Sequence, residues 1–121
     1  MELILDTSFI LTCLKEGIDF LEAEEFGSLV LPLQVIEEID KVKEKPGKEG
    51  ELADLALDII EKNKNKFKIV DLGKKFADAG IKRYVKGKKV VVATIDRELK
   101  RELRGRVSFL VIRARKKLEI V

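Results

Sequence analysis

Carboxylate side chains recur along this 121-residue chain at points where an apolar run ends. Asp6 directly follows the run Leu3–Leu5, and Asp96 comes three residues after a run that ends at Ala93. The chain has no histidine and a single cysteine, Cys13. That composition excludes histidine general bases, histidine-bearing triads, disulfides within the chain and zinc sites built from histidine or several cysteines. Any catalysis must therefore use carboxylates, hydroxyls, lysines or a metal ion held by oxygen ligands.

Two further pairs of carboxylates follow apolar runs in the middle of the chain. Glu37 and Glu38 lie just over one turn into a helix that Pro32 opens. Glu38 borders the apolar stripe of this helix, whereas Glu37 points almost opposite to it, at ~100° per residue. We therefore expect Glu38 to face a crevice and Glu37 to face solvent. Asp71 and Asp78 compete for the same role after the next run, with Asp78 flanking the buried side of its helix.

Each of these carboxylates also has an ordinary structural interpretation. Asp6, Asp71 and Asp96 stand where N-cap residues precede helices, and Asp54 and Asp58 form an acidic pair expected on a solvated helix face. Several carboxylates converging at one edge would raise one another's pKa unless a cation compensates them, and oxygen ligands suit Mg²⁺ or Mn²⁺. We therefore expect a divalent-cation site. Its predicted ligands are Asp6, Glu38, Asp78 and Asp96, and its predicted supporting hydroxyls, which could instead cap helices, are Ser8 and Thr94.

The elements that must position these residues follow from hydrophobic periodicity. Short apolar runs predict five strands, at residues 3–5, 28–31, 67–70, 89–93 and 107–112. Segments of helical period lie between them, near residues 7–15, 18–25, 33–44, 49–63, 74–86 and 96–103. This alternation predicts a single α/β domain over residues 1–121, a three-layer α/β/α sandwich with a mostly parallel five-stranded sheet. Ligands of such folds bind beyond the carboxyl ends of the strands, where the carboxylates stand.

The net charge of +3 conceals an uneven distribution along the chain. Residues 1–40 carry one basic and ten acidic residues, whereas residues 41–121 carry twenty-four basic and twelve acidic ones. A basic surface of this kind attracts a polyanion, although a Lys- and Glu-rich surface is also typical of hyperthermophile proteins. The cations expected to contact a nucleic-acid backbone form two clusters: Lys82, Arg83, Lys86, Lys88 and Lys89, and then Arg97, Lys100, Arg101 and Arg104.

The first residues of the chain lack the pattern of a targeting signal. No basic region precedes the first apolar run, which Asp6 breaks at once, and no run approaches the ~20 apolar residues of a spanning helix. We therefore expect a cytoplasmic protein without membrane contact.

The sequence resembles the PIN-domain family of nucleases along nearly its whole length. The resemblance rests on four segments, whose order and spacing are more specific than any one of them: Leu3–Ser8, Leu31–Ile39, Ala77–Ala79 and Val92–Leu99. It implies an acidic pocket of Asp6, Glu38, Asp78 and Asp96 that binds Mg²⁺ or Mn²⁺ and hydrolyses RNA phosphodiester bonds. Two residues depart from the family pattern. Ile95 stands where Asn is frequent, and Ala79 replaces a frequent acid, which leaves fewer ligands for a second metal ion.

The resemblance implies a metal-dependent endoribonuclease acting on single-stranded RNA. Small members of the family include toxins of toxin–antitoxin pairs and ribosomal-RNA processing factors, so the implied partners are an antitoxin or a ribosome-assembly factor, and members often form homodimers. The alternative is a PIN-like module that binds RNA or a protein without cutting. A phosphoacceptor receiver domain and an Asp-x-Asp phosphatase do not fit, because Thr7 and Ser8 stand where those folds need a second acid.

Overall fold

One sheet of six strands runs through the described part of the chain, residues 1–73 and 75–121 of a computed structural model, in the order β3-β2-β1-β4-β5-β6. Five strands are parallel: β1 (Glu2–Leu5), β2 (Ser28–Pro32), β3 (Lys68–Val70), β4 (Val90–Ala93) and β5 (Ser108–Arg113). The edge strand β6 (Lys117–Ile120) runs antiparallel to β5. The predicted α/β class and mostly parallel sheet are confirmed, and the predicted number of five strands is one too few.

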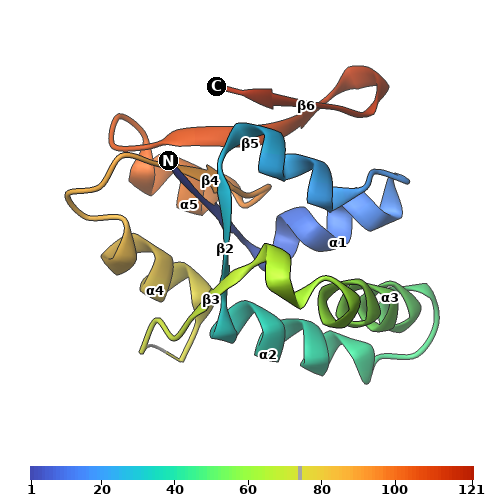
Figure 1. Ribbon diagram of the computed structural model, residues 1–121. Coiled ribbons are helices and arrows are strands. Elements are labelled where there is room, and N and C mark those ends of the chain that lie inside the picture. Colours follow the sequence, from blue (N-terminus) through green and yellow to red (C-terminus); the bar gives the residue numbers. More distant parts are fainter. Residues whose placement is uncertain (74) are drawn as a thin grey trace.

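Helices cover both faces of the sheet. The α-helices are α1 (Thr7–Lys15), α2 (Leu33–Lys43), α3 (Lys48–Lys62), α4 (Ala77–Tyr84) and α5 (Arg97–Leu103). The chain steps outward from β1 to β3 and then returns to β4 on the other side of β1, so right-handed crossovers place the later helices on the opposite face. In Figure 1, α1 and α3 accordingly lie to the right of the strands and α4 and α5 to the left.

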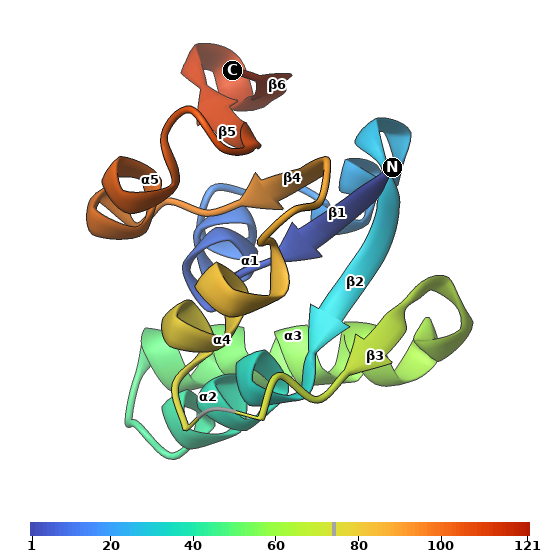
Figure 2. The same ribbon diagram turned by 90° about the vertical axis from the view of Figure 1, so that its left-hand side faces the viewer.

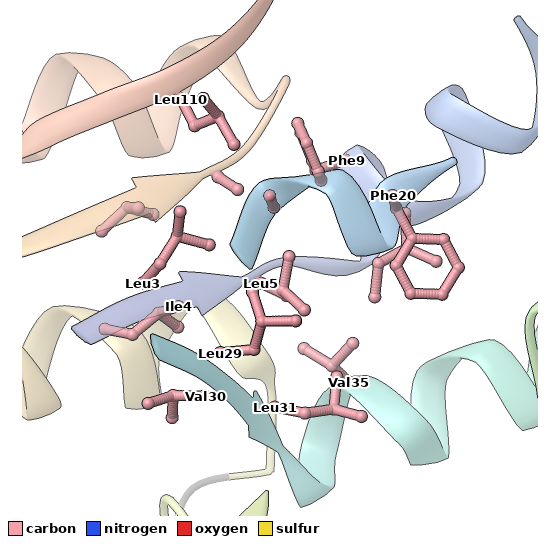
Figure 3. Packing of buried hydrophobic residues seen from close by; sticks show 14 of the residues in the cluster. Leu3, Ile4, Leu5, Phe9, Phe20, Leu29, Val30, Leu31, Val35 and Leu110 are labelled. Atoms are coloured by element: carbon pink, nitrogen blue, oxygen red, sulfur yellow. The ribbon is translucent and has the colours of Figure 1, made fainter. Parts of the chain in front are cut away.

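The hydrophobic core lies on both sides of the central strands. Leu3, Ile4 and Leu5 of β1 are all fully buried, as are Val92 and Ala93 of β4. Successive residues of a strand point to opposite faces, so continuous burial of this kind requires packed helices on both. Figure 3 shows Leu3 and Leu5 among side chains from neighbouring strands and helices. The uninterrupted apolar runs of the sequence therefore indicated two-sided burial correctly.

The missed strand, β6, depends on a hairpin that has no turn signal in the sequence. Its partner residues Arg113 and Lys117 flank η3 (Ala114–Lys116), a single 3₁₀ turn. Arg115 and Lys116 adopt φ values of 64° and 60°, the left-handed region that Gly, Asn or Asp usually occupies in hairpins. Because neither residue is of that type, the sequence pattern did not indicate a turn at this point.

Two predicted helices differ from the observed ones. Residues 18–25 form η1 (Phe20–Phe26), a 3₁₀ helix in which the Asp19 side chain accepts a hydrogen bond from the Leu21 N–H. A 3₁₀ helix rises about 2 Å per residue rather than 1.5 Å, so this connector covers more distance on the way from α1 to β2. The helix expected at 74–86 is α4, and its expected first residue, Lys74, lies outside the described residues. The remaining short element is η2 (Lys64–Lys66).

The helices of this fold are short and amphipathic. None of those in the described residues is both long enough and apolar enough to cross a lipid bilayer. Figure 2 shows the carboxyl ends of β1, β2 and β4, the strand ends from which the candidate site is built.

Candidate active site

The strand order has a switch point between β1 and β4. The helix that follows β1 packs on one face of the sheet and the helix that follows β4 packs on the other, and in open α/β sheets the carboxyl ends of two such strands are where ligands usually bind. Asp6 directly follows β1, and its backbone N–H donates a 3.0 Å hydrogen bond to the Ala93 carbonyl at the end of β4. Thr94 directly follows the last residue of β4. The fold therefore brings the first and fourth predicted motifs together at the expected sheet edge.

Asp6 is a buried carboxylate held by two hydroxyl groups. Its side chain is only 6% exposed, and its Oδ2 accepts hydrogen bonds from Thr94 Oγ1 at 2.7 Å and from Ser8 Oγ at 3.1 Å. Burial raises the pKa of Asp6, the two hydroxyl hydrogen bonds oppose that rise, and the negative charge of Glu38 adds to it. Asp6 occupies the N-cap position of α1, as that interpretation expected, but its side chain makes no capping hydrogen bond there and is held by Ser8 and Thr94 instead.

The two hydroxyl groups are likewise not helix caps. Ser8 Oγ accepts a hydrogen bond from the Ile95 N–H at 3.0 Å while donating to Asp6. Thr94 Oγ1 accepts from the Asp96 N–H at 3.1 Å. Each hydroxyl therefore joins the end of β1 to the segment after β4 and also fixes the orientation of the Asp6 carboxylate.

Glu38 reaches the same region from α2. Its Oε1 accepts a 2.6 Å hydrogen bond from Thr7 Oγ1, and its Oε2 accepts one of 3.0 Å from the Ala77 N–H. Ala77 is the first residue of α4, so Glu38 satisfies one of the N–H groups that a helix leaves unpaired at its start. Glu37 is exposed, as the helical periodicity predicted. Glu38 thus links three elements: α1, α2 and α4.

Asp96 and Asp78 approach the site from the amino ends of α5 and α4. Asp96 is the N-cap of α5, and its Oδ1 accepts hydrogen bonds from the N–H groups of Glu98 and Leu99 at 2.9 and 3.2 Å. Its capping interpretation is correct, and its Oδ2 makes no hydrogen bond to the described residues. Asp78 lies in the first turn of α4 and is exposed, and among the described residues its side chain accepts a hydrogen bond from the Ala79 N–H alone.

Asp71, the competitor of Asp78, has a different role. Its Oδ1 accepts hydrogen bonds of 2.8 Å from Gln34 Nε2 and from the Gly73 N–H. These two hydrogen bonds lower the pKa of Asp71, and the one from Gln34 has the larger effect. Asp71 therefore holds the turn after β3 rather than capping a helix as expected.

The comparisons with known proteins agree with this geometry. The family model of the PIN domain matches residues 3–105. This chain belongs to the PIN domain family. A solved structure titled "Structure of the PIN domain endonuclease Utp24" is similar to this PIN domain, with a TM-score of 0.77 and 26% sequence identity, over 98% of this chain and 90% of that one. No curated protein sequence matches it.

The donor set of this PIN domain suits a small, hard cation held largely through water. Within residues 1–73 and 75–121, no three His, Cys, Asp or Glu side chains gather closely enough to hold a metal ion. Among the predicted carboxylates, the negative charge of Glu38 contributes to the raised pKa of Asp6. No Lys or Arg of the described residues forms an ion pair with either. Mg²⁺ commonly binds through one or two carboxylates and several waters, so this pair fits it.

The predicted nucleic-acid-binding cations of the PIN domain divide into two groups on different faces of α5. Lys82, Arg83 and Lys86 line a cleft between α4 and α5, together with residues that include Glu102 and Arg106. Lys82 forms an ion pair with Glu102 at 2.6 Å, and Arg83 donates to the Leu72 carbonyl at 2.8 Å. The second predicted group lines a separate groove between α5 and β5: Arg97, Lys100, Arg101 and Arg104.

Sequence reasoning missed two residues that shape the site. The first is Thr7, whose hydroxyl donates a hydrogen bond to Glu38, a contact that the sequence analysis did not predict. Gln34 is buried on α2, where its Oε1 accepts from the Leu72 N–H at 3.0 Å while its Nε2 donates to Asp71. Gln34 lies one helical turn before Glu38. A polar side chain on the buried face of a helix needs a hydrogen-bond partner, so its position in the sequence could have indicated a structural role.

Proposed function

We propose that this PIN domain is a metal-dependent endoribonuclease whose centre is Asp6. The observation that carries the proposal is the buried Asp6 carboxylate at the switch point, oriented by Ser8 and Thr94 and facing the charge of Glu38. An arrangement of two like charges without a counter-cation is costly for the fold, and such costs are characteristic of functional sites. The similarity to a PIN domain endonuclease supports the same conclusion.

The residues of the site divide into ligands and positioning groups. Asp6 and Glu38 are the proposed direct ligands of Mg²⁺ or Mn²⁺, and Asp78 and Asp96 are the proposed groups that orient water at the rim. When bound, such a cation would lower the pKa of a coordinated water molecule and would stabilise negative charge on the phosphoryl oxygens of the substrate. Ser8 and Thr94 both bind Oδ2 of Asp6 and leave Oδ1 without a hydroxyl partner, so Oδ1 is the proposed ligand atom. Thr7 holds Oε1 of Glu38 and the Ala77 N–H holds Oε2, so both oxygens of this carboxylate are fixed in position.

The α4–α5 cleft is the proposed path of the RNA backbone. Its lining begins at Ala79, next to Asp78 at the acidic edge, and continues to Lys86 and Arg106. Neither Lys86 nor Arg106 forms an ion pair within the described residues, and both are exposed. Phosphate contacts by such cations contribute affinity that falls steeply with salt and carries little sequence information.

The decisive experiment compares neighbouring carboxylates. Purified protein with Mn²⁺ is expected to cleave a labelled single-stranded RNA, and Asp6→Asn and Glu38→Gln are expected to abolish or strongly reduce cleavage. Glu37→Gln, one residue away and exposed, is the matched control and should cleave like the wild type. If none of these proteins cleaves but all bind RNA, the chain is a binding module rather than a nuclease. Circular dichroism spectra that match the wild type establish that each variant is folded.

A second experiment tests the path of the RNA. Lys86→Ala combined with Arg106→Ala should raise KM for RNA, leave kcat near its original value and reduce the salt dependence of binding. Lys41→Ala on α2, an exposed cation outside the cleft, serves as the control. An unchanged KM in the double variant would exclude this cleft as the RNA path.

We further propose that the protein acts either as a toxin or as a ribosomal-RNA processing factor, and that it forms a homodimer. A toxin would arrest growth when expressed without its antitoxin, whereas a processing factor would leave uncut ribosomal-RNA precursors when it is removed. Light scattering on the purified protein measures whether it is a homodimer, as members of the family often are.

A further inference from the structure

A groove with a volume of about 780 Å³ lies between α5 and the β5–β6 hairpin. Figure 2 shows α5 beside this hairpin, at the upper left of the molecule. In a parallel α/β fold a helix usually follows each strand and covers the sheet, but in the described residues β5 is followed by η3 and β6 instead. The face of β5 next to α5 therefore becomes the floor of a groove.

The floor of this α5–β5 groove is apolar. Val107 is half-buried, and Val121 is 51% exposed. Phe109 and Val111 alternate with Val107 along the chain, so they share its face of the strand, and they are 8% and 9% exposed. Exposed aliphatic surface at the base of a concave site is characteristic of a surface that another apolar group covers.

The rim of the groove is basic. No acidic residue lines it, and Arg97, Lys100 and Arg104 form no ion pair within the described residues. Arg97 and Lys100 lie three residues apart on one face of α5, and Arg104 is the residue directly after this helix. Two further arginines of the lining are paired with acids that stand outside it: Arg101 with Glu98 at 3.5 Å, and Arg113 with Glu119 at 2.9 Å.

We propose that the α5–β5 groove docks an acidic amphipathic helix of a partner protein. Such a helix would place apolar side chains on Val107, Val111 and Val121 and carboxylates beside Arg97, Lys100 and Arg104. It would also occupy a place in the helical layer that no helix of the described residues fills after β5. Binding of an amphipathic helix in an apolar groove, with charges on the rim, is a general mode of peptide recognition.

The chemistry of the floor favours a peptide over RNA at this place. Single-stranded nucleic acid is bound by aromatic side chains on which bases stack, and the one aromatic residue of the lining, Phe109, is almost fully buried. The α4–α5 cleft has unpaired cations and shares no lining residue with the α5–β5 groove. The proposal therefore does not depend on nuclease activity, and the two surfaces can be altered separately.

The test uses a labelled synthetic peptide of about 16 residues, with leucine at helical i, i+3, i+4 and i+7 positions and glutamate on the flanks. Fluorescence anisotropy should show saturable binding. Lys100→Glu with Arg104→Glu should weaken it about tenfold or more, and so should Val121→Ser, whose exposed side chain is not needed for folding. Lys86→Glu with Arg106→Glu, in the α4–α5 cleft, should leave peptide affinity unchanged and weaken RNA binding.

Three outcomes would overturn the proposal. The first is an absence of saturable binding, or equal binding by all variants. The second is that the groove variants lose single-stranded RNA binding and keep the peptide, which would make the groove a nucleic-acid surface. The third is concentration-dependent self-association that Lys100→Glu abolishes and the peptide does not compete with, which would make a second copy of this chain the occupant.

Discussion

Thr94 at the end of β4 donates a 2.7 Å hydrogen bond to Oδ2 of Asp6 at the end of β1, across 88 residues of sequence. The same hydroxyl accepts from the Asp96 N–H, so a single side chain joins the first and last acidic motifs of the chain. This contact exists because β1 and β4 are neighbours in the sheet, with Leu5 paired to Ala93. The sheet register therefore determines the geometry of the site.

Removing the Thr94 hydroxyl should impair both catalysis and folding. Thr94→Val keeps the shape of the side chain but removes the donor to Asp6 and the acceptor of the Asp96 N–H. Loss of such a positioning contact costs about 10–100-fold in metal affinity or activity, and a buried N–H without a partner costs about 1–3 kcal/mol. Cleavage kinetics across a Mn²⁺ titration measure the first effect and urea denaturation the second. Thr94→Ser, which retains the hydroxyl, should stay close to the wild type.

Removing the Asp6 charge should stabilise the metal-free protein. Burial and the nearby charge of Glu38 both oppose ionisation of Asp6, so Asp6→Asn relieves that cost while keeping the side-chain size. We expect Tm to rise by about 3 °C or more, measured by differential scanning calorimetry with a chelator present. Asp54→Asn, at an exposed acid of α3, should leave Tm unchanged.

The same pair of proteins tests cation binding without an activity assay. A ligand that binds only the folded state stabilises it by about 2.7 kcal/mol at one hundred times its Kd. Mn²⁺ should therefore raise the Tm of the wild type and of Asp54→Asn but not that of Asp6→Asn. Equal shifts in all three proteins would show that the cation binds elsewhere.

Gly80 should be intolerant of a side chain because α4 packs closely against the loop after β3. A Cβ at Gly80 would lie 2.5 Å from the Cβ of Leu72 and 2.8 Å from its Cδ1. Overpacking of this kind costs about 1–3 kcal/mol, which exceeds the gain of about 1 kcal/mol that alanine brings to a helix interior. Gly80→Ala should therefore lower the midpoint of urea unfolding. A higher midpoint would mean that the loop yields without cost.

Cys13 should resist thiol reagents in the folded protein. Burial, together with the charges of Glu22 and Asp19, raises the pKa of its thiol to about 12. At pH 8 only roughly one thiol in ten thousand is then the reactive thiolate. Alkylation followed by mass spectrometry should proceed slowly in buffer and at the rate of an ordinary cysteine in urea. Rapid labelling in buffer would contradict the packing of Cys13 in the core.

Much of the scaffold could be read from local patterns, and the reason is periodicity. The continuous apolar runs at Leu3–Leu5 and Val90–Ala93 indicated strands buried on both faces, and helical spacing separated Glu38 from Glu37 correctly. Each of these features depends on residues a few positions apart, whose relative directions the backbone alone determines. For the same reason, the placement of acids at the carboxyl edge of a parallel sheet was foreseeable.

The hydrogen bonds and ion pairs between residues far apart in the sequence were decided only by the tertiary structure. Sequence spacing could not show that Thr94 would bind Asp6, that Thr7 would bind Glu38, or that Lys82 would be paired with Glu102. Nor could it show β6, because left-handed turn residues other than glycine adopt that conformation only when the surrounding pairing requires it. The lack of histidine and the order of the acidic motifs thus restricted this protein to oxygen-ligand chemistry. Its sheet register decided which oxygens meet, since hydrogen-bond partners are selected by position in space and not by distance along the chain.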